Sequence, residues 1–323
     1  MTVCPRCYQQ VARSGECPNC HFDVPVEWLT STQLAIAITG ARTAGKSVLI
    51  GVMMDQFEYF LGQQHQSFLT PLGSTKERFH QKYRVPLFEQ RNLLRPTPPA
   101  RDEQLEPLLW SFEYGEQAVC LSIIDAAGED FESLAPSDAR FRYLGFSDLI
   151  VAMVDPLKVP GVAAVLEGVV TVPRGSGHDL EVMRSVLAAR AAHRQQGGPD
   201  QVLGIVLSKF DVLQRMRDLS ASPWQSIFNR PGSTLQRDPS MVSAFDNRND
   251  ADLLQHELNG LLGQLGASML LTAASDAQIP YRLFATSALG AEPNAATIGR
   301  GGIVPFRVLD VLQAALTKKI GVR

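Results

Sequence analysis

The sequence predicts an α/β protein, because stretches typical of buried strands alternate with stretches typical of helices. Six short, mainly apolar runs have the length of buried strands and lie at 34–39, 107–114, 118–125, 148–155, 202–207 and 281–285. Apolar residues recur at helical spacing in 47–61, 180–193, 252–271 and 306–316. The chain has 323 residues and is 45% hydrophobic, which suits one large or two ordinary globular domains.

Composition and charge restrict the classes of function. The net charge of −3 argues against a general nucleic-acid-binding protein, although a nucleotide needs only local positive groups. The longest apolar stretches are about six residues, as in 149–154, which is far shorter than a membrane span. The first residues, MTVCPRC, lack the apolar segment of a signal peptide. We therefore expect a cytoplasmic protein without a membrane span.

Four of the five cysteines lie within the first twenty residues, in the sequences CPRC and CPNC. They are Cys4, Cys7, Cys17 and Cys20, and two closely spaced pairs of this kind can place four thiolates around Zn²⁺. Two disulfides or a redox-active pair are the alternatives, which a cytosolic location and the doubled motif disfavour. The sequence therefore predicts a zinc ribbon over residues 1–28, held together by the metal because so short a segment cannot bury a core.

The stretch GARTAGKS, residues 40–47, has the glycine spacing and the Lys-Ser ending of a phosphate-binding loop. It lies between a predicted strand and a predicted helix, which is the context that such a loop requires. Backbone amides would face the phosphate oxygens, Lys46 would reach the β- and γ-phosphates, and Ser47 would bind Mg²⁺. The alternative is a glycine-rich turn beside a core helix. The predicted nucleotide contacts of this stretch are Gly40, Ala41, Arg42, Thr43, Ala44, Gly45, Lys46, Ser47 and Val48.

A later stretch adds groups suited to a triphosphate with its metal. The predicted hairpin over 107–125 ends in DAAGED, residues 125–130. Asp125 would hold Mg²⁺ through water, and Gly128 could bring its backbone N–H to a γ-phosphate because it has no side chain.

Two further stretches favour guanine as the base. The fifth strand runs into SKFD, where the candidate base contacts are Ser208, Lys209 and Asp211. The Asp211 carboxylate can accept hydrogen bonds from N1–H and the 2-amino group of guanine, a donor pair that adenine lacks, and the Lys209 stem can lie along the base. The last strand runs into TSALG, where the candidates are Ser287 and Ala288, whose backbone N–H could reach the 6-oxo group.

These features occur in the order GARTAGKS, a threonine before the hairpin, DAAGED, SKFD and TSALG. Together they resemble the Ras-like P-loop GTPases of the translation-factor-related class over residues 33–318, and the cysteine pairs ahead of them resemble the layout of the bacterial double-GTPase group. The resemblance implies the P-loop GTPase fold, with a mostly parallel six-stranded sheet and helices on both faces. It also implies Mg²⁺-dependent hydrolysis of GTP to GDP and phosphate in a nucleotide-dependent switch. The expected partners are GTP or GDP and a protein regulator, effector or second GTPase.

The resemblance assigns catalytic roles as well. Thr97 is the expected switch I ligand of Mg²⁺, with Thr70 and Thr75 as alternatives. Arg95 is a candidate arginine finger or else a solvated loop arginine. The expected catalytic residues are therefore Lys46, Thr97, Glu129 and Arg95.

Two departures from the family pattern leave a second function open. Glu129 stands where these GTPases usually have the glutamine that orients the attacking water, so the resemblance makes it the candidate for positioning that water. Ser208 stands where Asn or Thr is usual. These two departures weaken the case for hydrolysis more than the case for binding. Residues 212–280 are too many for a loop and contain a helical pattern, which predicts a helical insertion in a GTPase domain over 29–323. The alternative function is a catalytically weak GTP- or GDP-binding scaffold that recruits partners through the zinc ribbon and the insertion.

Overall fold

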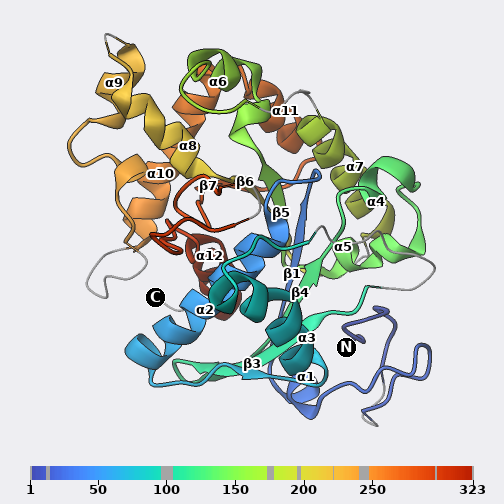
Figure 1. The fold of residues 1–323 in the computed structure, drawn as a ribbon. Coiled ribbons are helices and arrows are strands. Elements are labelled where there is room, and N and C mark those ends of the chain that lie inside the picture. The colour runs from blue at the N-terminus through green and yellow to red at the C-terminus, as the bar shows by residue number, and fades with distance from the viewer. Residues whose placement is uncertain are drawn as a thin grey trace.

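The computed structural model contains a seven-stranded sheet with helices around it (Figure 1). It describes residues 2–11, 15–95, 105–172, 178–194, 198–220, 222–239, 247–294 and 297–321. The strands are β1 (Thr32–Gly40), β2 (Thr70–Pro71), β3 (Leu108–Tyr114), β4 (Gln117–Asp125), β5 (Leu149–Val154), β6 (Val202–Leu207) and β7 (Tyr281–Ala285). Their order in the sheet is β2-β3-β4-β1-β5-β6-β7. The β2–β3 and β3–β4 pairs are antiparallel, and every other pair is parallel.

Helices precede, connect and follow these strands. The longer ones are α2 (Lys46–Phe60), α7 (His178–His193), α10 (Asn247–Gln264), α11 (Ser268–Asp276), α12 (Asp310–Ile320) and the π-helical η2 (His80–Glu89). The shorter ones are α1 (Val26–Thr30), η1 (Leu61–His65), α3 (Thr75–Phe79), α4 (Asp130–Ser133), η3 (Ala139–Phe141), α5 (Arg142–Phe146), η4 (Pro156–Lys158), α6 (Pro160–Val165), α8 (Phe210–Gln214), η5 (Arg215–Asp218), α9 (Pro223–Phe228) and η6 (Thr234–Gln236). Within the described ranges, no helix combines the length and the hydrophobicity needed to cross a bilayer.

Each face of the sheet has its own buried core, because successive strand residues point to opposite faces. On one face, Leu34 and Ile36 of β1 pack in a cluster with residues of α2, η2 and α12. On the other face, Ala37 of β1 and Ile150 of β5 pack with residues of α5, α7, α10 and α11. Burial on both faces is why the central strands have almost continuous apolar sequences.

The predicted α/β class and the mostly parallel sheet are confirmed, but the predicted number of strands is wrong. The sheet has seven strands instead of six, because β2 is only two residues long, contains Pro71 and has no strand-like pattern of its own. The helical pattern of 252–271 belongs to two helices. Gly266 separates them with φ +74°, a left-handed conformation that ends a helix and that glycine adopts without strain.

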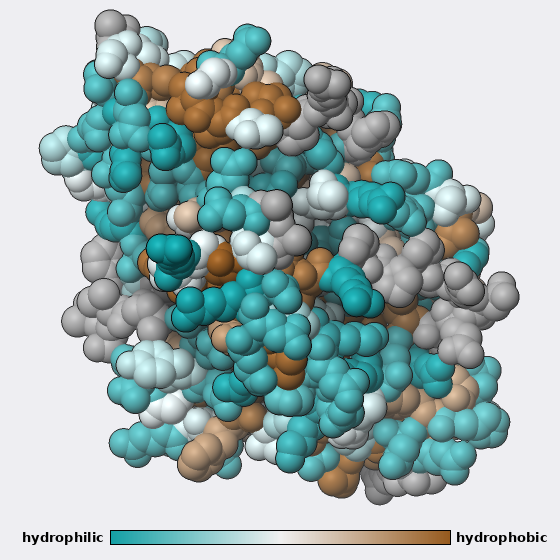
Figure 2. Space-filling view, viewed as in Figure 1, coloured by the Kyte–Doolittle hydropathy of each residue, from teal (hydrophilic) through white to brown (hydrophobic). Residues whose placement is uncertain are grey.

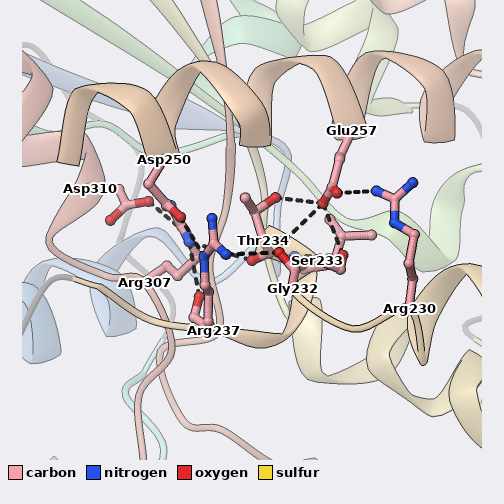
Figure 3. A network of polar contacts seen from close by, with 10 residues as sticks. Arg230, Gly232, Ser233, Thr234, Arg237, Asp250, Glu257, Arg307 and Asp310 are labelled. Carbon is pink, nitrogen blue, oxygen red and sulfur yellow. Dashed lines mark hydrogen bonds and ion pairs between the residues drawn. The ribbon is translucent and has the colours of Figure 1, made fainter. Parts of the chain in front are cut away.

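A buried arginine ties the helical segment between β6 and β7 to the rest of the protein (Figure 3). Arg307, whose side chain is 1% exposed, donates from Nη2 to Asp250 of α10 at 2.5 Å and from Nε to Asp310 of α12 at 2.7 Å. Its Nη1 also donates to the Arg237 carbonyl oxygen at 2.9 Å. Arg307 therefore joins three segments at one point.

The carboxylate of Glu257 makes a separate set of contacts within the helical segment between β6 and β7 (Figure 3). Glu257 of α10 accepts hydrogen bonds from the Thr234 hydroxyl at 2.6 Å, the Thr234 backbone N–H at 3.0 Å and the Ser233 hydroxyl at 2.9 Å. Arg230 forms an ion pair with the same carboxylate. Glu257 therefore supplies acceptors for the hydroxyl and backbone N–H donors of the turn that leads into η6.

The N-terminal cysteine segment packs against strands β3 and β4 of the sheet. Trp28 is 2% exposed, lies in one apolar cluster with Leu109 and Cys120, and donates its indole N–H to the Val3 carbonyl oxygen at 2.8 Å. Tyr8 stacks on Phe146 of α5 with ring centroids 5.4 Å apart. The segment therefore shares buried contacts with the rest of the chain.

Candidate functional site

A cavity of about 590 Å³ opens where the parallel strands end. The turns that follow β1, β4, β5, β6 and β7 all contribute to its wall, together with residues 93–95, 170–171 and 291–293. In sheets of this kind the carboxyl ends of neighbouring parallel strands lie along one edge, where the connecting loops converge and ligands bind. Stretches that are far apart in the sequence therefore meet at one place.

The loop between β1 and α2 has the curved backbone of an anion cradle. Gly40, Thr43 and Gly45 have φ values of +140°, +64° and +88°. A Cβ atom on Gly40 would lie 2.7 Å from the carbonyl oxygen of Met153 on β5, so only glycine fits there. The loop ends at the N-terminus of α2, where backbone N–H groups and the helix dipole attract anions.

Lys46, the first residue of α2, is 7% exposed and points back into the loop. Its Nζ donates to the carbonyl oxygens of Gly40 and Ala41, each at 2.9 Å. Burial lowers the pKa of Lys46, and the negative charge of Asp125 acts in the opposite direction. The loop therefore holds a cationic group beside the place where an anion would lie.

Asp125 at the end of β4 connects the loop to a helix that the sequence did not implicate. Its Oδ2 accepts from the Ser47 hydroxyl at 2.7 Å and from the Tyr83 hydroxyl of η2 at 3.0 Å. Burial raises the pKa of Tyr83 well above its usual value, which keeps the phenol protonated and able to donate. Two oxygen atoms suited to Mg²⁺, those of Ser47 and Asp125, are thus adjacent, with Tyr83 bound to one of them.

The segment after β4 lies directly on the loop. A Cβ atom added to Gly128 would come within 2.7 Å of the Arg42 nitrogen and 2.8 Å of the Gly40 oxygen, so the two backbones are in close contact. Glu129 pairs with Arg42 at 3.0 Å. The carboxylate expected to position a water molecule is therefore held by an arginine of the loop.

The residues expected to contact a base form two polar pairs in the cavity wall. Lys209, with φ +48°, pairs through Nζ with Asp155 at 2.5 Å. The Ser287 hydroxyl donates to Asp211 at 2.5 Å, and burial raises the pKa of Asp211 although this hydrogen bond opposes the shift. Ser208 does not reach the phosphate loop, since its hydroxyl donates to the Val154 carbonyl oxygen at 3.0 Å.

Two charged residues that support the phosphate loop were missed by the sequence analysis. Lys158 of η4 donates to the Arg42 carbonyl oxygen at 3.3 Å and to Asp179 of α7 at 3.2 Å. Asp179 also accepts from the Asp155 backbone N–H at 2.7 Å. The sequence signal nearest to Lys158 and Asp179 is the Asp-Pro pair at 155–156, which predicts a turn after β5. It does not indicate which residues contact that turn.

The cavity gathers most of the predicted contacts. The ones that line it are Arg42, Thr43, Ala44, Gly45, Lys46, Ser47, Val48, Arg95, Gly128, Glu129, Ser208, Lys209, Asp211, Ser287 and Ala288. Gly40, Ala41 and Asp125 do not line it, but each is bonded to Lys46 or Ser47. Thr97 lies outside the described residues. Neither alternative threonine lines the cavity, because Thr70 belongs to β2 and buried Thr75 accepts from the Leu109 backbone N–H.

The four N-terminal cysteines form a compact cluster of free thiols. The Sγ atoms of Cys4 and Cys20 are 3.7 Å apart, those of Cys7 and Cys17 are 3.5 Å apart, and all four lie within 4.8 Å of one another. Zinc bonds to sulfur of about 2.3 Å in a tetrahedron separate the sulfur atoms by ~3.8 Å, so one zinc ion fits the cluster. Burial alone would raise the pKa of the Cys17 thiol, but hydrogen bonds from the Cys20 and Asn19 amides lower it to about 7.

Comparison with known proteins gives a relative over most of the chain. A protein of Mycolicibacterium smegmatis, which carries the provisional name ESX-1 scaffolding and assembly protein SaeC, is 34% identical over 307 residues. The aligned region covers 92% of this chain and 78% of the relative. No protein-family model matches the chain.

This relative corrects the functional assignment made from the motifs. Its name describes scaffolding and assembly and not nucleotide hydrolysis, so the assignment to the Ras-like GTPases is wrong. The predicted GTPase activity, and with it the classification of the chain as a GTP-binding hydrolase, is overturned by the same finding.

Proposed function

Because the chain belongs to the family of the ESX-1 scaffolding and assembly protein SaeC, we propose that it is itself a scaffold that holds protein partners together during assembly. The observation that carries this proposal is the extent of the similarity, 34% identity across 92% of the chain. An alignment of that length is too long to reflect a single local motif. A shared overall role is therefore the simplest explanation.

Three features suit a scaffold that binds more than one protein. The zinc module that we propose for residues 1–28 precedes the domain that we propose for 29–323, and the inserted subdomain that we propose for 212–280 lies within that domain. Figure 2 shows hydrophobic residues gathered over α6, and Val169, which follows that helix, is 37% exposed. A clustered apolar surface of this kind is typical of protein contact sites.

Zinc would serve a structural role in the first of these features. The cluster of Cys4, Cys7, Cys17 and Cys20 would supply four ligands and leave no position for a substrate, as structural zinc sites do. Free thiols also suit a reducing compartment, which supports the expected cytoplasmic location.

We further propose that the central cavity binds a nucleotide that the scaffold retains without turning it over. The curved loop, the cation of Lys46 and the N-terminus of α2 would bind the phosphates, and Ser47 with Asp125 would hold Mg²⁺. Asp211 and Ser287 lie in the same cavity and would meet the base. A ligand of this size would bridge the loops after five strands and make the platform more rigid.

The scaffold proposal is tested by crosslinking in living cells. The tagged chain is expressed in its own host, treated with a lysine-reactive crosslinker and analysed by mass spectrometry. The proposal expects crosslinks to at least two proteins of one assembly, which no longer associate when the chain is removed. Crosslinks confined to the chain itself, or partners that remain associated without it, would refute the scaffold.

The nucleotide proposal has a separate test. Nucleotide released from freshly purified protein is identified by mass, and its affinity is measured by calorimetry with GTP, GDP, ATP and ADP in the presence of Mg²⁺. We expect binding without sustained phosphate release. Absence of binding by all four nucleotides would remove this part of the proposal and leave the scaffold proposal standing.

A further inference from the structure

A second cavity, of about 410 Å³, lies between α2, α3, η2 and the edge strands of the sheet. None of its residues lines the central cavity. Its apolar wall consists of Met54, Leu69, Phe79 and Trp110, of which Met54 and Trp110 are almost fully buried. The rings of Phe79 and Trp110 meet edge to face at 5.5 Å. The cavity therefore has a firm apolar interior that could enclose a large side chain.

The acidic groups at the rim of this cavity already have partners. Glu58 of α2 pairs with Arg84 of η2 at 3.4 Å. Glu77 of α3 accepts a hydrogen bond from the Gln81 side chain. Each carboxylate therefore already accepts from a side chain of the protein itself.

The basic groups at the rim are in a different situation. Lys76 and His80 are exposed, and neither has a side-chain hydrogen bond or ion pair within the part of the chain that the structure describes. Lys82 lies two residues beyond His80 and is equally exposed, but it does not line the cavity. The unpaired donors beside the apolar wall therefore favour a ligand that carries carboxylates.

The surroundings of the cavity favour a protein ligand. Phe68 is 87% exposed and immediately precedes Leu69 of the wall, so the apolar surface continues outward from the cavity. The outermost strand β2 pairs through only two residues and contains Pro71, which makes addition of another strand unfavourable. A partner would therefore bind here through its side chains.

We propose that the second cavity receives an apolar side chain of a protein partner, and that carboxylates flanking this side chain bind Lys76 and His80. The proposal goes beyond the scaffold function, because it names a surface and the chemistry of the segment that binds it. It can be measured on the purified chain without any assembly. Its failure would therefore leave the scaffold proposal untouched.

The probe is the short peptide Asp-Glu-Leu-Phe-Glu-Asp with blocked ends, titrated into full-length protein labelled with ¹³C in its methionine methyl groups. Met54 lies in the wall, and its signal is assigned with the Met54→Leu variant, which conserves volume. We expect the peptide to shift the Met54 signal in a saturable way. A counterpart with lysines in place of the four acidic residues should bind about fivefold more weakly, since the exposed ion pair with Lys76 and the hydrogen bond from His80 are lost.

Charge reversal at the rim provides the decisive comparison. The double variant Lys76→Glu, His80→Glu should reverse the preference, so that the lysine peptide binds more tightly than the acidic one. Lys82→Glu is the matched control on the same helix, and it should leave the parent order unchanged. An unshifted Met54 signal, equal binding of both peptides by the parent, or a reversal caused equally by Lys82→Glu would overturn the proposal.

Discussion

Replacing Arg307 with alanine should strongly destabilise the protein, because the substitution leaves Asp310 buried without a counter-charge and leaves Asp250 with Arg237 as its only cationic partner among the described residues. The side chains of Asp250 and Asp310 are 0% and 9% exposed, and both accept from the guanidinium of Arg307. Burial raises the pKa of Asp310 to about 6 even with the arginine present, which shows how costly its charge is at this position. Removing one partner of a buried ion pair typically costs about 3–5 kcal/mol, and we expect about 4 kcal/mol of unfolding free energy to be lost.

The assay is urea unfolding at pH 7, followed by circular dichroism, with hydrogen exchange of α10 as a local readout. Arg230→Ala is the matched control, because Arg230 also pairs with a carboxylate of α10 but its side chain is 62% exposed. That substitution should cost about 0–1 kcal/mol. If Arg307→Ala costs within 1 kcal/mol of Arg230→Ala, Arg307 does not clamp the helical segment as argued.

Three further predictions concern the two proposed ligand sites. Cys4→Ser combined with Cys20→Ser should abolish binding of about one Zn²⁺ per chain by elemental analysis and lower thermal stability, whereas Cys120→Ala should retain the metal; zinc retained by the double variant would contradict the site. Lys46→Ala should weaken nucleotide binding by at least about a hundredfold in calorimetry through the loss of a buried charge-assisted contact, and binding within threefold of the parent would exclude the loop as the phosphate site. Tyr83→Phe should strengthen Mg²⁺-dependent nucleotide binding about threefold to tenfold, because the hydroxyl no longer donates a hydrogen bond to the Asp125 carboxylate that would hold the metal. Unchanged or weaker binding would show that this hydrogen bond does not compete with the metal.

Much of the fold was predictable because it is encoded locally. The buried strands have continuous apolar runs, and the Gly40 and Gly45 pattern marks a curved loop between a strand and a helix. Once the strands are parallel, their carboxyl ends lie along one edge, so Lys46, Asp211 and Ser287 necessarily approach one another. These statements need no knowledge of which residues are in contact.

The remaining features depend on contacts between distant residues, which local patterns do not record. Tyr83 reaches Asp125 across 42 positions of sequence, from a helix that carries no motif. Arg307 stands in the left-handed region with φ +52° and joins Asp250, within the predicted insertion, to Asp310, which follows it. Strand β2 exists only because β3 pairs with it.

Function was the least predictable property, because the motifs were read through analogy with a family. A set of loops that can hold a phosphate is compatible with catalysis and with binding alone, and fold-level likeness does not decide between them. The pairing of Glu129 with Arg42 is a weak contact between partly exposed side chains, so a measurement of phosphate release is what separates these two functions.

The most direct test of the central claim is the mass of the complex formed by the purified chain, bound to nucleotide and Mg²⁺, with two partners identified by crosslinking. Light scattering gives this mass, and free phosphate is measured in the same sample. The account predicts a ternary complex that contains both partners, forms only with the chain present and releases no phosphate over time. Partners that exclude one another from the chain would contradict the claim that the protein is a scaffold, and continuous release of phosphate would contradict the claim that it retains its nucleotide without turnover.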